Sequence, residues 1–469
     1  KVALEAAIGA SIAGARSMAS MKHVGLNVAA DPLFSFVYQG VNGGMVIITA
    51  DEPGQHSSQN EQDNRHYAKA AKIAMMEPSD SQEARDFMKE AFEISEQFDT
   101  PILMRMTTRL CHSKGIVECA ERADVPAKKY EKNIAKHLNP PAIAKKQRIL
   151  LEDRLAKLKE FSETTHLNRI EDNGKKVGVV VSGMCYCYAK EVFGDDVNYL
   201  KLGFTYPLPS ELIKKFCTGL DTIYVIEEND PILEEEIQRV GFAPKGKNTF
   251  PAYDELTSDV IRKCVFGKTF ESVDYDRTKV VARPPALCAG CPHRGLFYEL
   301  GKKKNVLISG DIGCYTLGFA DPYNAMDLNL CMGASFSMGH GAAKKFEMFH
   351  EDMRVVSVLG DSTFFHTGIN SLVECIYNGS KTVNIILDNR ITGMTGHQEN
   401  PGSGKHADGS DATAIDIETV CRALGAKNIR TIDPNNLTLM RETLDWALGL
   451  DEPSVIITKW PCVLKKFSE

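Results

Sequence analysis

Short runs of mostly apolar residues recur along the chain, separated by longer amphipathic stretches. The apolar runs predict strands, and the amphipathic stretches predict helices between them. Strands are expected at residues 45–49, 101–106, 177–181, 222–226, 306–308, 355–359, 383–387 and 454–458. These runs show little of the polar alternation of half-exposed strands, so they are typical of parallel sheets covered by helices on both faces. The pattern therefore predicts an α/β fold with mostly parallel sheets.

Apolar residues at helical spacing predict the helices between these strands. Residues 1–21, rich in Ala and Gly, are expected to form a helix that packs closely on another backbone. A second helix is expected to begin at Ser79 and Gln82, which resemble a capping box, and to run to Phe98. A third helix is expected to have one apolar face, formed by Ile369, Leu372, Val373 and Ile376.

A change in composition between residues 123 and 173 separates the first α/β unit from the rest of the chain. This stretch is rich in Lys, Glu and Ala, and it predicts a helical connector with a narrow stripe of Leu151, Leu155 and Leu158. At 469 residues, with 43% hydrophobic and 25% charged residues, the chain is long enough for about three globular domains. We place the α/β domains at residues 1–122, 174–277 and 278–469.

Charge and cysteine usage exclude several classes of protein. The net charge of −7 and the lack of a long basic run argue against a nucleic-acid partner. No apolar stretch reaches the length of a membrane-spanning helix. The 13 scattered cysteines do not suggest a disulfide framework and favour a reduced, cytoplasmic setting. Because the chain starts at Lys1 within a helical pattern, we expect that part of its N-terminus is missing.

Polar residues follow two of the predicted strands at the point where each strand ends. Asp361 follows the strand at 355–359, and Asn389 follows the strand at 383–387, with one predicted helix between them. In a βαβ unit the two strands are parallel neighbours, so both side chains converge on one crevice. With the carbonyl of Ile391 they form a partial oxygen shell suited to Mg²⁺ and a diphosphate. A lone Gly-Asp-Ser sequence, such as residues 360–362, is usually an ordinary turn. The presence of Asn389 at the end of the next predicted strand favours the metal site instead.

Other glycine-rich turns are expected on the same sheet edge. Residues 310–314 follow the strand at 306–308, and residues 333–335 open a helix rich in small side chains. Backbone N–H groups in such turns, helped by the helix dipole, bind diphosphate oxygens. One such turn is weak evidence, but together with Asp361 and Asn389 these turns favour a diphosphate site.

Two further segments carry candidate chemistry, each with a plainer alternative. Cys288 and Cys291 have ligand-like spacing, but no second pair complements them. Their loop is either a packing loop with buried cysteines or a wall of the cofactor site, where His293 could meet an anion or a substrate. His56 lies in the polar loop after the strand at 45–49 and is a candidate acid, base or carboxylate ligand. A loop histidine is, however, usually only solvated.

Together these motifs resemble those of thiamine-diphosphate enzymes, with Ser362 and Asp388 as mild departures. Across nearly the whole chain the segments are similar to the 2-oxoacid:ferredoxin oxidoreductases, and within them to the α subunits of the indolepyruvate branch. The most specific pieces are residues 31–33, 53–63, 288–294, 310–314, 331–335 and 392–402. The resemblance implies three layered domains of the thiamine-diphosphate-enzyme type: pyrimidine-binding (1–122), transketolase C-terminal-like (174–277) and diphosphate- and Mg²⁺-binding (278–469).

The resemblance also implies which residues serve the cofactor. The catalytic candidates are His56, His293 and Glu5. Glu5 is a candidate only as a substitute, because the position of the family's activating carboxylate lies, by register, immediately before Lys1. The expected Mg²⁺ ligands are Asp361, Asn389 and the Ile391 carbonyl. The residues expected to contact the cofactor are Cys288, Cys291, Pro292, His293, Gly310, Asp311, Gly313, Cys314, Gly333, Ala334, Ser335, Gly360, Asp361, Ser362, Thr363, Asn389, Ile391, Thr392, Gly393, Met394 and Thr395.

The activity implied by the resemblance is the oxidative decarboxylation of aryl pyruvates with coenzyme A to aryl-acetyl-CoA. Electrons would pass through iron–sulfur clusters to ferredoxin, in a cytoplasmic α2β2 or larger assembly with a β subunit. The family carries its [4Fe–4S] clusters on a C-terminal ferredoxin-like module, so their ligands are expected outside this chain. Two alternatives stay open: a non-redox thiamine-diphosphate decarboxylase or carboligase, and a non-catalytic scaffold of this fold that binds another nucleotide.

Overall fold

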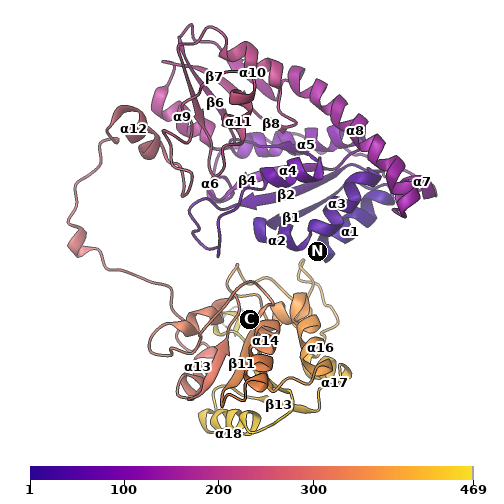
Figure 1. The fold of residues 1–469 in the computed structure, drawn as a ribbon, viewed down its shortest axis with the longest axis vertical. Coiled ribbons are helices and arrows are strands. Elements are labelled where there is room, and N and C mark those ends of the chain that lie inside the picture. The colour runs from indigo at the N-terminus through magenta and orange to yellow at the C-terminus, as the bar shows by residue number, and fades with distance from the viewer. Residues whose placement is uncertain (467–469) are drawn as a thin grey trace. The chain divides into compact units, whose positions relative to one another are not determined.

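The computed structural model describes residues 1–466, which divide into two compact units, residues 1–274 and residues 275 onward (Figure 1). The strands of the described residues form two sheets in the first unit and one in the second. Neighbouring strands are parallel except at one edge of each sheet in the first unit. The predicted α/β class with mostly parallel sheets is therefore confirmed. No helix among the described residues combines the length and apolar character needed to cross a bilayer.

The first sheet has the strand order β1-β2-β4-β3-β8, with β8 antiparallel to β3. Successive residues of β2 face opposite layers: Met45 and Ile47 pack toward α1, α3 and α4, whereas Val46 packs toward α5. The strands are β1 (Ser17–Lys22), β2 (Met45–Asp51), β3 (Ala74–Met76), β4 (Ile102–Thr107) and β8 (Phe204–Tyr206). The helices are α1 (Val2–Ile12), α2 (His23–Val28), α3 (Ala30–Gln39), α4 (Arg65–Ala71), α5 (Ser81–Phe98) and α6 (Thr108–His112).

Two details of the first sheet differ from the sequence prediction. The helix expected over residues 1–21 ends at Ile12, because Gly14 adopts a left-handed backbone (φ 107°) and the chain turns into the edge strand β1. The predicted capping box at Ser79 and Gln82 is also wrong. Asp80 caps α5 by accepting a hydrogen bond from the backbone N–H of Glu83, since a carboxylate satisfies the open helix end as well as a hydroxyl does.

The second sheet has the order β5-β7-β6-β9, with β5 antiparallel to β7. The strands are β5 (Asn168–Glu171), β6 (Val177–Ser182), β7 (Asn198–Leu202) and β9 (Thr222–Ile226). Helices α9 (Cys185–Phe193) and α12 (Ser258–Phe266) cover one face, and α10 (Ser210–Cys217) and α11 (Ile232–Arg239) cover the other. In the predicted connector only α7 (Ile134–His137) and α8 (Pro141–Thr164) are helical, and Leu151 and Leu158 of α8 are buried as expected.

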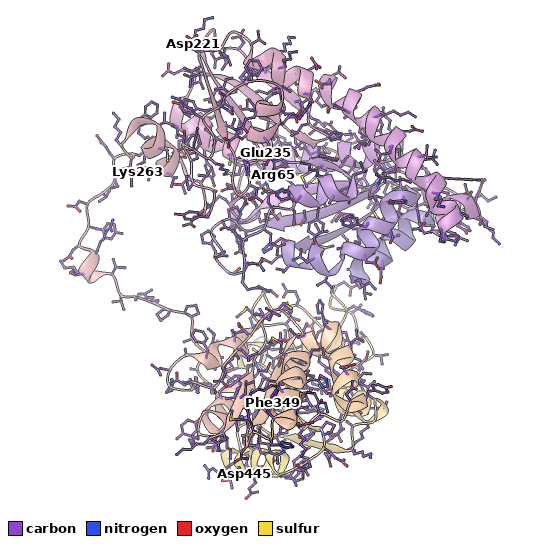
Figure 2. All side chains as sticks on the ribbon, viewed as in Figure 1. Arg65, Asp221, Glu235, Lys263, Phe349 and Asp445 are labelled. Carbon is purple, nitrogen blue, oxygen red and sulfur yellow. The ribbon has the colours of Figure 1, made fainter. Side chains whose placement is uncertain are left out.

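A buried network of charged side chains joins these two sheets. Arg105, from β4, donates to Asp51 at the end of β2 (Nε to Oδ2, 2.5 Å). Arg65, which Figure 2 labels, donates to Asp63 (Nη2 to Oδ2, 2.6 Å) and to Glu227 after β9 (Nη1 to Oε2, 2.5 Å). All of these side chains are buried. Because a buried charge is unfavourable unless it is paired, the network fixes the second sheet against the carboxyl ends of the first.

Glu228 lies beside this network and should make the stability of the first unit depend on pH. Burial raises the pKa of Glu228 from 4.5 to about 7, and its Oε1 accepts a hydrogen bond from Leu256 N–H (3.2 Å). Between these pH values the folded chain therefore binds a proton that the unfolded chain releases. Stability falls as pH rises through this window, because the ionised carboxylate is disfavoured only in the folded state.

Glu228→Gln removes this titration while it keeps an acceptor for Leu256. We expect the variant to be more stable than the wild type at pH 8, by on the order of 3 kcal/mol, and equally stable near pH 5. Thermal denaturation of the intact chain at both pH values measures the difference. A variant that differs from the wild type by the same amount at both pH values contradicts this expectation.

The sheet of the second unit has the order β10-β11-β12-β14-β13 and is parallel throughout the described residues. The strands are β10 (Val306–Ser309), β11 (Arg354–Gly360), β12 (Thr382–Asp388), β13 (Asn428–Ile432) and β14 (Ser454–Lys459). Helices α13 (His293–Leu300) and α18 (Leu437–Leu448) pack on one face. Helices α14 (Ser335–Met348), α16 (Ile369–Tyr377) and α17 (Ile417–Ala423) pack on the other.

The βαβ unit predicted from the sequence is confirmed in this sheet. Strands β11 and β12 are parallel neighbours, so that Gly360 lies beside Leu387 and both strands end at the same edge. The short helix α15 (Asp361–Thr363) and a π-helix (Phe364–Gly368) lead into α16. The predicted apolar face of α16 is wrong at Val373, which is 42% exposed, because Cys375 takes the buried position beside Leu372.

Candidate active site

A pocket lies in the second unit at the carboxyl ends of β10, β11 and β12. Most of the residues expected to contact the cofactor line it: His293, Gly313, Cys314, Gly360, Asp361, Ser362, Thr363, Asn389, Ile391, Thr392, Gly393, Met394 and Thr395. Its other lining residues, which were not among the expected contacts, are Ile312, Tyr315, Met332 and Leu387. The expected contacts that lie outside this lining are Cys288, Cys291, Pro292, Gly310, Asp311, Gly333, Ala334 and Ser335.

Asp361 presents a buried carboxylate oxygen to this region. Its Oδ1 accepts a hydrogen bond from Ser362 N–H (2.7 Å), but within the described residues its Oδ2 has no hydrogen-bond partner. Asn400 lies close enough to lower the pKa of Asp361, yet its amide does not meet hydrogen-bond geometry. Burial, reinforced by the nearby Asp388 carboxylate, nevertheless raises the pKa of Asp361 to about 7. An unsatisfied buried carboxylate needs an explanation, and a bound cation supplies one.

Asn389 faces the same pocket, and its amide is held from both sides. Its Oδ1 accepts from the backbone N–H of Ile391 (3.2 Å), and its Nδ2 lies 3.4 Å from Nε2 of His293. His293 is 3% exposed, and burial lowers its pKa to about 4, so its ring is neutral at pH 7. A neutral ring nitrogen can accept the Asn389 N–H, which directs the amide oxygen away from His293.

Asp311 organises the start of α14. Its buried carboxylate accepts hydrogen bonds from the backbone N–H groups of Gly333 (2.9 Å) and Ser335 (3.1 Å). These two N–H groups, which were expected to bind diphosphate oxygens, are therefore already paired inside the protein. Burial raises the pKa of Asp311 to about 6, although the same N–H groups act in the opposite direction. If residues 333–335 contact a cofactor, they do so through atoms other than the N–H groups of Gly333 and Ser335.

Two glycines of the pocket allow a tyrosine ring to approach the backbone. A Cβ on Gly313 would lie 2.4 Å from the Tyr315 ring, and a Cβ on Gly360 would lie 2.7 Å from it. The Tyr315 hydroxyl donates to the carbonyl of Ile312 (2.8 Å). Glycine is thus required at both positions by the close packing of Tyr315, rather than by a special backbone angle.

Four cysteines gather at one side of the pocket. Burial, with the nearby thiols of Cys314, Cys288 and Cys462, raises the pKa of Cys291 to about 11. Burial, with Cys462 and Cys288, also raises the pKa of Cys314. From the sequence only Cys288 and Cys291 had ligand-like spacing: Cys314 was expected as a cofactor contact but not as their neighbour, and Cys462 lies far along the chain. Their positions after β10 and β14, at one edge of a parallel sheet, were the available signal. No three His, Cys, Asp or Glu side chains of the described residues already stand in a closed metal-binding arrangement.

The histidine predicted in the first unit is already paired. His56 Nε2 lies 3.4 Å from Glu255 Oε2, and the same carboxylate receives two hydrogen bonds from Arg109 (2.6 and 2.5 Å). The carboxylate of Glu61 connects the loop that carries His56 to the segment around residue 254. It accepts hydrogen bonds from the backbone N–H groups of Gly54 (2.8 Å) and Asp254 (3.0 Å). No sequence motif marked the roles of Arg109 and Glu255, since their contacts join segments that are far apart in the chain.

Glu5, the substitute carboxylate, lies on α1. Its side chain is 45% exposed and forms an ion pair with Lys1 (3.2 Å). The buried face of this helix consists instead of Leu4, Ala7 and Ser11. A catalytic role of Glu5 stays a prediction without support from this geometry.

Two family models match the chain. Residues 2–178 match the thiamine-diphosphate-binding domain of pyruvate flavodoxin/ferredoxin oxidoreductases. Residues 311–458, which include most of the pocket, match the C-terminal TPP-binding domain of thiamine pyrophosphate enzymes. Among solved structures, a benzoylformate decarboxylase from Polynucleobacter necessarius is similar with a TM-score of 0.32 and 14% identity, covering 97% of this chain and 89% of that chain. Similarity at that level carries no information about the reaction.

Curated relatives are much closer in sequence. The chain is 41% identical to the indolepyruvate oxidoreductase subunit IorA of Methanothermobacter marburgensis, over 99% of this chain and 79% of that protein. It is 36% identical to the subunit of the same name from Pyrococcus horikoshii, over 100% of this chain and 78% of that protein. With both thiamine-diphosphate domain matches, this similarity shows that the chain belongs to the family of indolepyruvate oxidoreductase subunits IorA.

Proposed function

We propose that this chain is the thiamine-diphosphate-binding subunit of an enzyme that converts aryl pyruvates, indolepyruvate among them, and coenzyme A to aryl-acetyl-CoA and carbon dioxide. The two electrons released leave through iron–sulfur clusters to ferredoxin. The observation that carries the proposal is the unpartnered Asp361 oxygen beside Asn389, at the carboxyl ends of parallel strands, in a chain of this family. The proposed partners are a β subunit in an α2β2 or larger cytoplasmic assembly, and ferredoxin.

The donor chemistry of the pocket fits a magnesium diphosphate. Asp361 and Asn389 would hold Mg²⁺ with their side-chain oxygens, and Ile391 would hold it with its carbonyl. When bound, thiamine diphosphate supplies the electron sink that decarboxylation of a 2-oxo acid requires. The protein's own contribution is position: His293 orients the Asn389 amide, and Asp311 fixes the turn at 333–335. The apolar side chains of Ile312, Tyr315 and Leu387 also line the pocket and would limit the access of water to a cofactor bound there.

The four gathered cysteines suggest an exit for the electrons. Thiolates are the usual ligands of a [4Fe–4S] cluster, and Cys288, Cys291, Cys314 and Cys462 come together from three segments of the chain, with Cys314 in the pocket lining. We therefore propose that this chain holds one cluster itself, contrary to the expectation that all cluster ligands lie elsewhere. Binding would require the four thiols to turn toward a common centre.

An anaerobic assay of the assembled enzyme tests the proposed function. Indolepyruvate with coenzyme A should reduce a viologen dye, and the rate should depend on both thiamine diphosphate and Mg²⁺. Carbon dioxide release without dye reduction would instead indicate the non-redox decarboxylase. Iron content and visible absorbance of the chain, compared with a Cys314→Ser variant, test the cluster separately. Equal iron in both proteins would contradict its assignment.

His56→Ala should slow turnover without loss of cofactor binding. His56 lies in the loop after β2 and is half exposed, so it can meet substrate, and general acid–base groups typically contribute about 100-fold or more to a rate. We expect kcat to fall by about that factor, with the affinity for thiamine diphosphate unchanged. The matched control is His166→Ala, which removes another exposed histidine paired with a glutamate. Wild-type turnover in the His56 variant would remove His56 from the catalytic residues.

A further inference from the structure

The segment that follows β14 lies along the carbonyl groups of the proposed metal-binding turn. The backbone N–H of Trp460 donates to the carbonyl of Asp388 (3.1 Å), and the N–H of Cys462 donates to the carbonyl of Asn389 (3.0 Å). The ammonium of Lys465, in α19 (Val463–Lys466), donates to the carbonyl of Arg390 (3.2 Å). Three successive carbonyls of the turn are therefore bonded to one short segment, residues 460–465.

Lys465 also connects the turn to the far side of the loop that follows it. The same ammonium lies 3.2 Å from Glu399 Oε2, and the two side chains are only 18% and 26% exposed. A partly buried charged hydrogen bond is stronger than an exposed one, because water competes less for either partner. The lysine thus holds together the two ends of residues 390–399, which include the Ile391 carbonyl.

The turn itself has a backbone that needs such support. Arg390 has a left-handed conformation (φ 62°), which is uncommon for a residue other than glycine. Its side chain is anchored on the other side of the turn, with Nη1 donating to the carbonyl of Gly402 (2.7 Å) and Nε lying 3.2 Å from Asp388 Oδ1. The backbone carbonyl of Arg390 accepts instead from Lys465. The side chain and the carbonyl of Arg390 are therefore held by different partners.

We propose that Lys465 is a positioning residue for the metal–diphosphate site: it fixes the turn that presents the Asn389 side chain and the Ile391 carbonyl. The proposal rests on the proposed function of that site. It assigns a role to a residue that is not part of the pocket lining and that no motif in the sequence marked.

The test measures the affinity of the intact chain for thiamine diphosphate by calorimetry at saturating Mg²⁺. Lys465→Met should weaken binding by about tenfold, since hydrogen bonds to a charged donor are lost. Lys465→Arg keeps the charge and donors and should remain within about twofold of the wild type. The control is Lys427→Met, an exposed lysine of the same unit. Thermal unfolding without cofactor should show that all three variants are still folded at the temperature of the titration, so that weaker binding reflects the position of the turn.

Glu399→Gln provides a second variant that keeps an acceptor but removes the charge. It should weaken binding less than Lys465→Met does, and the effects of the two changes should not add in the double variant, since both act on one contact. Unchanged binding in Lys465→Met overturns the inference, as does a loss that Lys465→Arg fails to rescue. A wild-type chain that binds no thiamine diphosphate overturns the proposed function as well, so the two failures are distinguishable.

Discussion

Asp361→Ala should abolish the retention of thiamine diphosphate at ordinary cofactor concentrations. The residue offers a buried carboxylate oxygen without a hydrogen-bond partner among the described residues, and a divalent ion is the partner that its chemistry fits. Even the groups that only orient metal ligands typically contribute up to about 100-fold in metal affinity, so loss of a ligand itself should exceed that factor. Calorimetric titration of the variant with Mg²⁺ and thiamine diphosphate measures the loss.

The stability of the Asp361 variant separates a lost ligand from a damaged fold. Burial already raises the pKa of this carboxyl, so its removal takes away an unfavourable buried charge and leaves the packing of β11 intact. We expect the melting temperature without cofactor to stay the same or to rise. Asp352→Ala, at an exposed position before the same strand, is the control and should bind cofactor normally. Cofactor affinity unchanged in the Asp361 variant would show that the metal lies elsewhere.

Arg65→Met should destabilise the first unit by about 3–5 kcal/mol, because it leaves buried carboxylates without their partner. The guanidinium donates to Asp63, to Glu227 and to the carbonyls of Glu228 and Asp230, and its side chain is 3% exposed. Both sheets of the unit depend on these bonds. Urea denaturation of the intact chain should show the loss as a lower transition midpoint for the first unit.

Arg239→Met is the matched control for the Arg65 variant. Arg239 pairs with Glu236 on the surface of α11 and is 58% exposed, so its ion pair is screened by water. An exposed pair of this kind contributes at most about 1 kcal/mol. If the two variants lose similar stability, the buried network does not hold the two sheets together.

The sequence predicted the parts of the fold whose signal is local. Apolar runs marked β11 and β12, and the rule that βαβ strands are parallel neighbours brought Asp361 and Asn389 to one sheet edge. The edge strand β1 was missed because its residues are as small and mixed as those of α1, and only pairing with β2 makes it a strand. Local propensity cannot report a partner that lies elsewhere in the chain.

The parts of the site that were missed depend on contacts between distant segments. Cys314 was expected as a cofactor contact, but its grouping with Cys462 and the Cys288 loop forms only once the sheet has assembled. Lys465 likewise reaches Arg390 across a separation that no motif spans. Asp311 was expected to contact the cofactor, but its acceptor oxygens are used by the start of α14. A carboxylate beside a glycine-rich turn can bind the turn's own N–H groups, and the sequence does not distinguish that role from ligand binding.

Binding of thiamine diphosphate to the wild-type chain, titrated calorimetrically with and without Mg²⁺, tests the central claim most directly. We predict saturable binding that requires the divalent ion and that thiamine without its diphosphate does not reproduce. Binding of the same strength in the presence of a chelator, or preferential binding of a nicotinamide dinucleotide, would contradict the assignment of Asp361, Asn389 and Ile391 to a metal–diphosphate site.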